Sequence, residues 1–200
     1  MKKTSAQRIA GIAILSALSI VFVLTVHFPL IPTAAFLEYD PADIPIFIAT
    51  FMYGPLTGLV ITAVVCVLQG ITVSSGGGWY GILMHFVMTG AYVLIAGLIY
   101  KKFRSIKGVL IAMAAGTVGW IALSIPMNLL ITPLYTGAPV EVVKSMILPA
   151  ILPFNALKVA INTVVTFLLY KRLKWLFNKM RINTDPVVLK KRTDTEKPEE

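Results

Sequence analysis

Long stretches of apolar residues without a charged side chain recur along this chain of 200 residues. Hydrophobic residues make up 57% of it, and the mean hydropathy is +0.82, which is too high for an ordinary water-soluble domain. A helix needs about 20 apolar residues to cross a hydrocarbon layer roughly 30 Å thick. We therefore expect an all-α integral membrane protein. The candidate spans are residues 9–28, 43–53, 56–72, 81–100, 108–131 and 147–170.

The number of spans depends on Gly54 and Pro55, which leave residues 43–72 as either one kinked helix or two short helices. Basic residues form three clusters, within residues 2–8, 101–107 and 171–181. Cytoplasmic loops carry an excess of Lys and Arg, and all three clusters lie inside only if the chain breaks at Gly54. We therefore predict six transmembrane helices, with both termini cytoplasmic, in the cell membrane. This orientation explains the net charge of +9 better than nucleic-acid binding does.

The membrane domain is expected to cover residues 1–181. Residues 182–200 are polar and mixed in charge, which predicts a disordered cytoplasmic tail. The predicted outer loops, residues 29–42, 73–80 and 132–146, are longer than the inner ones and rich in Gly, Pro and aromatic residues. Loops of this kind often bind or cover ligands, so we expect a ligand pocket on the outer side.

Lys158 is the only charged residue within the last apolar stretch. In a helix it shares one face with Asn155 and Asn162, and Asn128 in the fifth span can join them. An ammonium group at mid-membrane costs about 2.5–3.5 kcal/mol on insertion scales, so it needs a partner. Amide and ammonium donors can read the edge of a planar polar ligand, and a bound solute would then satisfy Lys158. The alternatives are contacts between helices, favoured for Asn162, or a lysine that reaches the outer surface.

The outer loop before the second span reads Glu38-Tyr39-Asp40-Pro41-Ala42-Asp43. We expect Asp40 to begin a turn, Asp43 to cap the second span, and the loop to line the mouth of the pocket. Ser74 to Gly78 lacks the spacing and the Lys of a phosphate-binding loop, so we interpret it as a flexible turn.

Nothing in the sequence indicates an enzyme. It holds one cysteine, Cys66, and two histidines, His27 and His85, in no pattern typical of a metal or catalytic centre. We interpret His85 as a packing or interface residue. The chain also lacks a nucleotide-binding motif, so energy for uphill transport would come from another subunit or an ion gradient.

Several motifs resemble one family, the substrate-binding (S) subunits of energy-coupling factor vitamin transporters. They are the Ala13-x-x-x-Ala17 pattern of the first span, the Leu37–Asp40 loop before Asp43-Ile44-Pro45, and the pair Gly54-Pro55. The resemblance covers about residues 8–175. The block Leu152-Pro153-Phe154-Asn155-Ala156-Leu157-Lys158, with Asn128 before Pro133-Leu134-Tyr135, is similar to the riboflavin-specific members.

The resemblance implies a function and a site. Asn128, Asn155 and Lys158 would hydrogen-bond riboflavin, and the loop from Leu37 through Glu38 and Tyr39 to Asp40 would close over it from outside. Ala13 and Ala17 would dock on a transmembrane coupling subunit that carries two ATPase subunits. The whole subunit would topple in the membrane to release the vitamin inward. Riboflavin would be the transported substrate, and no cofactor is implied.

Other functions remain open on the sequence alone. The same transporter class could carry FMN, whose phosphate could meet Lys158 or Lys144, or another vitamin such as thiamine or pantothenate. From different classes, the chain could be an intramembrane enzyme acting on lipids or a purely structural membrane subunit.

Overall fold

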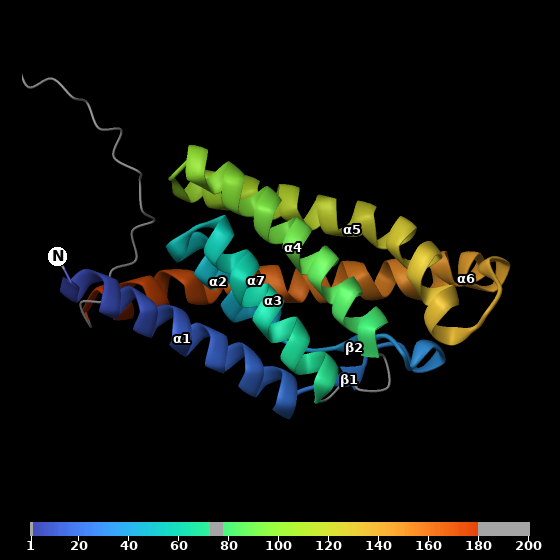
Figure 1. Cartoon of the computed structure of the whole chain (residues 1–200). Helices are drawn as coiled ribbons and strands as arrows, with labels where there is room; N and C mark the ends of the chain where they lie inside the picture. The colour runs from blue at the N-terminus through green and yellow to red at the C-terminus, as the bar shows by residue number, and fades with distance from the viewer. Residues whose placement is uncertain (1, 73–77, 180–200) are drawn as a thin grey trace, which may run out of the picture.

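The computed structural model describes residues 2–72 and 78–179, which form a mostly helical bundle with the long helices side by side (Figure 1). The helices are α1 (Lys2–Thr25), α2 (Asp43–Tyr53), α3 (Pro55–Ile71), α4 (Gly78–Lys102), α5 (Ile106–Thr136), α6 (Val140–Met146) and α7 (Leu152–Lys179). By length and composition, four helical segments can cross a membrane: Ala6–Thr25, Gly78–Lys102, Ile106–Thr136 and Val140–Tyr170. The remaining helices α2 and α3 are shorter apolar helices of 11 and 17 residues.

The predicted break at Gly54 is confirmed, because α2 ends at Tyr53 and α3 begins at Pro55. Gly54 has φ 99°, a backbone conformation that residues with a Cβ rarely adopt. Pro55 then occupies the first position of α3, where its missing N–H leaves no helical hydrogen bond unmade. The two short helices therefore fold against each other and do not form one long span.

The predicted outer loop at residues 132–146 is wrong. Helix α5 continues to Thr136 with Pro126 and Pro133 inside it, and α6 begins at Val140, so only three residues connect them. Gly137 ends α5 in the left-handed conformation, with φ 70°, and its N–H donates to the Pro133 carbonyl. A glycine in this conformation is a common helix end. The first helix also ends earlier than predicted, at Thr25 and not at residue 28.

A wider helical turn joins α6 to α7. Residues Ile147–Ile151 form a π-helical turn that contains Pro149. Proline has no N–H to donate and its ring crowds the preceding turn, so a wider turn lets the helical path continue past it. The predicted sixth span, residues 147–170, thus lies within a longer helical segment that starts at Val140.

The two ends of the bundle differ in chemistry. At one end, strands β1 (Phe28–Pro29) and β2 (Glu38–Tyr39) pair antiparallel and enclose the 3-10 turn Pro32–Ala34. The start of α1, the turn between α4 and α5 and the end of α7 all lie at the other end (Figure 1). The described residues of the three basic clusters belong to these segments, so the fold separates a basic end from a loop-covered end.

Buried aromatic rings fill the centre of the bundle. Phe47 of α2 stacks on Tyr92 of α4, with ring centroids 3.8 Å apart. Toward the basic end, Phe51, Tyr100 and Tyr170 contact one another edge to face. A second apolar cluster lies at the loop-covered end, where Leu37 and Tyr39 of the loop pack with Ile151 and Phe154. The loop is therefore attached to the helical segment α6–α7 by burial of apolar surface.

Close contact between α4 and the α2–α3 pair depends on Gly97. A Cβ at this position would lie 2.7 Å from Cβ of Pro55 and 2.9 Å from Cγ2 of Thr50. We predict that Gly97→Ala lowers the free energy of unfolding by about 1–3 kcal/mol, because overpacking forces the backbones apart. Gly81→Ala is the matched control: it lies in the same helix with open space around it, so alanine should be neutral or slightly stabilising. Thermal unfolding in detergent gives the unfolding midpoint of each variant. Equal midpoints for Gly97→Ala and Gly81→Ala would contradict this account of the packing.

Candidate ligand-binding site

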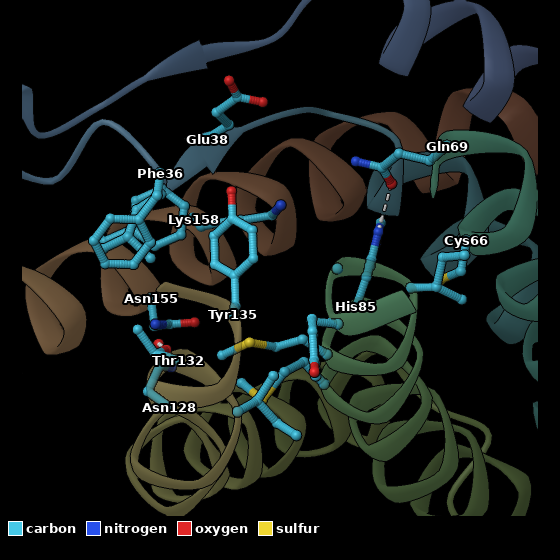
Figure 2. A pocket seen from close by; sticks show the side chains of 18 of the residues that line it. Phe36, Glu38, Cys66, Gln69, His85, Asn128, Thr132, Tyr135, Asn155 and Lys158 are labelled. Carbon is cyan, nitrogen blue, oxygen red and sulfur yellow. Dashed lines mark hydrogen bonds between the residues drawn. The ribbon is translucent and has the colours of Figure 1, made fainter. Parts of the chain in front are cut away.

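A cavity of about 350 Å³ lies at the loop-covered end, between the loop and helices α3, α4, α5 and α7. Its volume falls within the range of about 300–1,000 Å³ that is typical of small-molecule sites. Figure 2 shows side chains from the loop and from these helices converging on it. Its polar lining residues are Glu38, Asp40, Gln69, His85, Asn128, Thr132, Asn155 and Lys158.

Lys158 projects from α7 toward the loop, and its ammonium group lies 2.8 Å from Oδ2 of Asp40. Both residues line the cavity, and both are buried, with 8% and 2% of their surface exposed. The expectation of a cavity beside Lys158 is confirmed. The expectation that a solute alone satisfies the charge is wrong, because Asp40 already does so. A buried charge needs such a partner, since an isolated one would be strongly unfavourable in a low-dielectric interior.

The amide groups of Asn155 and Asn128 are held in fixed orientations. Asn155 donates to the Ile151 carbonyl at 2.9 Å and accepts from Nε1 of Trp120 at 3.0 Å. Asn128 donates to the Ser124 carbonyl at 2.8 Å and accepts from the Thr132 hydroxyl at 3.0 Å. An amide has two N–H donors and two oxygen lone pairs. Asn155 and Asn128 therefore each keep one N–H donor and one oxygen lone pair for a further partner. Two oriented donor–acceptor pairs are thereby offered at the cavity wall.

A hydrogen-bonded chain of buried polar groups starts from the ion pair. Gln69 of α3 contacts Oδ2 of Asp40 at 3.5 Å through its amide nitrogen, and its amide oxygen lies 2.6 Å from Nδ1 of His85. Nε2 of His85 lies 3.0 Å from Oδ1 of Asp43. Both ring nitrogens thus face oxygen atoms, and both donate when the imidazole carries two protons.

Sequence reasoning assigned the wrong role to Asp43 and only part of the role of His85. Asp43 was expected to cap its helix, but its carboxylate accepts hydrogen bonds from Thr89 and Asn162 as well as contacting His85. His85 was expected to be a packing or interface residue; it does link α4 to α2, but it also lines the cavity, which was not expected. Gln69 was not singled out. The signal that could have found Gln69 and His85 is their polarity within apolar stretches, the same signal that revealed Lys158.

Tyr39 and Asn162 belong to the support of the site and do not line the cavity. The Tyr39 hydroxyl donates to Oδ1 of Asn162 at 3.0 Å, and Asn162 donates to Oδ2 of Asp43 at 3.1 Å. Burial raises the pKa of the Tyr39 hydroxyl above its ordinary value, so it remains a neutral donor. These contacts agree with the expectation that Asn162 joins helices.

The other predicted loop residues lie at the cavity itself. Leu37 is buried and lines it, while Glu38 is exposed at its edge. Oδ1 of Asp40 accepts from the Ala42 N–H at 3.1 Å, as expected for an aspartate that begins a turn. Aromatic side chains complete the wall, and Phe36, Trp120, Tyr135 and Phe154 are among them. Flat apolar surfaces beside oriented amides suit a planar ring with a polar edge.

Two further predictions concern regions away from the cavity. Ala13 and Ala17 lie on the exposed face of α1, four residues apart and therefore one helical turn from each other. Most of the predicted glycine-rich turn, residues 74–78, lies outside the described residues, and so does the predicted disordered tail, residues 182–200.

Comparison with known proteins identifies the class. The family model described as "ECF transporter, substrate-specific component" matches residues 7–170. The riboflavin transporter FmnP of Bacillus subtilis (strain 168) is 32% identical over 85% of this chain and 94% of that protein. The riboflavin transporter RibU of Staphylococcus aureus (strain TCH60) is 33% identical over 84% of this chain and 90% of that protein. A solved bacterial ECF transporter S component superimposes with a TM-score of 0.74 at 27% identity, covering 86% of this chain and 98% of that one.

The chain therefore belongs to the family of substrate-specific components of ECF transporters. It is a multi-pass membrane protein of a transport system and not an enzyme.

The Lys158–Asp40 pair should be strongly coupled in stability. We predict that Lys158→Met or Asp40→Asn alone destabilises the ligand-free protein by about 3–5 kcal/mol, because each leaves one buried charge unpaired. The double variant should recover most of this loss. Glu38→Gln, which alters an exposed neighbour, should have little effect. Thermal unfolding in detergent provides the double-mutant cycle, and simple addition of the two single losses would contradict the coupling.

Proposed function

We propose that this chain is the riboflavin-binding subunit of an ATP-driven ECF importer, which captures the vitamin from outside and delivers it inward. The observation that carries the proposal is the cavity in which Asn155, Asn128 and Lys158 retain unused hydrogen-bonding groups beside aromatic walls. The similarity to riboflavin transporters over most of the chain supports it.

The chemistry of the flavin ring matches this lining. The isoalloxazine ring is flat, is apolar at its dimethylbenzene edge, and carries carbonyls and ring nitrogens along its pyrimidine edge. Asn155 and Asn128 can each supply one N–H and one oxygen lone pair to that edge, and Lys158 keeps two N–H groups after its bond to Asp40. Phe36 and Phe154 lie where they can cover the ring. Exclusion of water strengthens every such bond.

The loop from Leu37 to Asp40 is proposed to close the cavity from outside. Leu37 supplies apolar contact, Glu38 lies at the edge, and Tyr39 and Asp40 attach the loop to α7 through Asn162 and Lys158. A loop attached at two points needs little further ordering when ligand enters, which favours tight binding.

Among alternative vitamins, a neutral flavin fits the charges best. FMN carries a phosphate. Asp40 is already paired with Lys158, which leaves Glu38 as a negative charge without a cation beside it in the cavity lining, while Lys144 does not line the cavity. Like charges placed together cost free energy, so FMN should bind more weakly than riboflavin. Pantothenate is also an anion, and thiamine lacks the row of carbonyls that the free N–H groups would meet.

The proposed topology has six transmembrane helices with both termini cytoplasmic. The support is the three basic clusters, which belong to segments at one end of the bundle (Figure 1). Cytoplasmic loops carry an excess of Lys and Arg, so this end is proposed to be the cytoplasmic one. The membrane domain would then be residues 1–181, with residues 182–200 as a cytoplasmic tail.

A transmembrane coupling subunit with two ATPase subunits is the proposed partner. The support is the exposed pair Ala13 and Ala17, because small residues one turn apart let a second helix approach closely in lipid.

Riboflavin binding tests the function and the site together. Asn155→Ala and Lys158→Ala should each weaken binding about tenfold or more, since each removes a hydrogen bond to the proposed ligand. Lys144→Ala, which changes a lysine outside the cavity, should bind like the parent. Quenching of flavin fluorescence by purified protein gives the dissociation constants. Parent-like binding in both cavity variants would refute the site, and a parent that fails to bind riboflavin would refute the function.

Docking through α1 should be separable from binding. We predict that Ala13→Trp with Ala17→Trp abolishes riboflavin uptake by cells that supply the coupling module, because the large side chains keep the partner helix away. Riboflavin binding by the isolated variant should be unchanged, since neither residue lines the cavity. Val118→Trp provides a control at an exposed position of another helix, α5. Uptake at the parental rate in the double variant would exclude this face as the docking surface.

A further inference from the structure

A second cavity lies at the basic end of the bundle, opposite the ligand site. Its volume is about 290 Å³, and it is enclosed by α1, the α2–α3 turn, α4 and the turn that follows α4. Its floor is formed where Gly97 meets Thr50 and Pro55. The proposed function makes no use of this cavity.

Three cations line this second cavity: Arg8 of α1, Lys101 at the end of α4, and Arg104 in the turn beyond. No acidic residue is among its lining residues. In residues 2–72 and 78–179, the acidic residues are Glu38, Asp40, Asp43 and Glu141, all in the loop-covered half of the fold. The positive charge of the second cavity therefore has no carboxylate beside it within the described part of the chain.

Arg8 is already oriented at this site. Its guanidinium donates to the Tyr53 carbonyl at 3.1 Å and lies 5.8 Å from the centre of the Tyr53 ring. A guanidinium has five N–H donors, so most of them remain for another ligand.

The surroundings of the second cavity are apolar and open to the side. Leu56 lines it and is 73% exposed, and Val60, one turn further along α3, is 63% exposed. In a membrane protein such side chains contact acyl chains. A ligand that fits both the cation-lined cavity and the exposed apolar side chains of α3 has an anionic head and apolar tails. The head lies between the cations, and the tails run along α3.

We propose that the second cavity binds the headgroup of an anionic phospholipid. Its phosphate oxygens accept charge-assisted hydrogen bonds from Arg8, Lys101 and Arg104. Basic pockets between membrane helices on the cytoplasmic side are suited to such headgroups. The bound lipid bridges α1, α2 and α4 at the end of the bundle remote from the vitamin. This assignment holds whatever ligand occupies the first cavity.

The test is native mass spectrometry of the full-length protein released from nanodiscs that contain equal amounts of phosphatidylglycerol and phosphatidylcholine. The parent should retain phosphatidylglycerol in about tenfold excess, given the gain for each cation near the lipid phosphate. Arg8→Gln with Lys101→Gln and Arg104→Gln should abolish that excess. If removal of Arg8 impairs folding, the double variant Lys101→Gln with Arg104→Gln should still reduce the excess severalfold.

The matched control is Lys102→Gln with Lys107→Gln and Arg172→Gln. It removes the same charge from the same end of the bundle, at residues that do not line the second cavity. It should retain the preference of the parent. An equal loss in both triple variants would show diffuse attraction and overturn the site, as would a parent without preference.

Two further measurements distinguish the lipid from other ligands. Inorganic phosphate at millimolar concentration should not displace the lipid, and displacement would indicate a site for a soluble anion. If the cavity variant keeps its lipid preference and loses only assembly with the coupling subunit, the cations serve a protein interface and the proposal is wrong.

Discussion

The contact between Lys158 and Asp40 couples the outer loop to the last helix of the bundle. A charge inside a membrane protein needs a partner, and here the partner comes from a segment more than one hundred residues earlier in the chain. The pair places the loop over the cavity and positions the ammonium group at its wall. Because Gln69 and His85 continue the contacts from Asp40 to Asp43, helices α2, α3, α4 and α7 all meet at this one polar cluster.

The two ends of the molecule serve different tasks. The loop-covered end concentrates the acidic residues and amides of the described chain, and it encloses space for a ligand. The basic end carries the arginines and lysines that orient a membrane protein, and three of them surround a second cavity. Between these ends the interior is packed with aromatic rings. The proposed sites for solute and for lipid thus lie at opposite ends of the bundle.

Much of this arrangement could be predicted from the sequence, because the length of an apolar stretch and the position of a charged residue can be recognised without knowing the fold. The break at Gly54 follows from the basic clusters, and the cavity beside Lys158 follows from the cost of a charge in lipid. What could not be predicted was pairing over long distances. Asp43 read as a helix cap, and only the fold brings His85, Thr89 and Asn162 to its carboxylate. The path of α5 through Pro133 was also missed, because proline usually indicates a loop.

The stack of Phe47 on Tyr92 has a consequence for transport. These rings are among the largest fully buried side chains, and they lie between the cavity at the loop-covered end and the basic end. A solute the size of a vitamin would have to separate several helices to travel straight through such a core. We propose that unloading on the inner side uses the same mouth that admits the solute. In that proposal the bundle turns over as one body, as the family resemblance implies, while its interior stays intact.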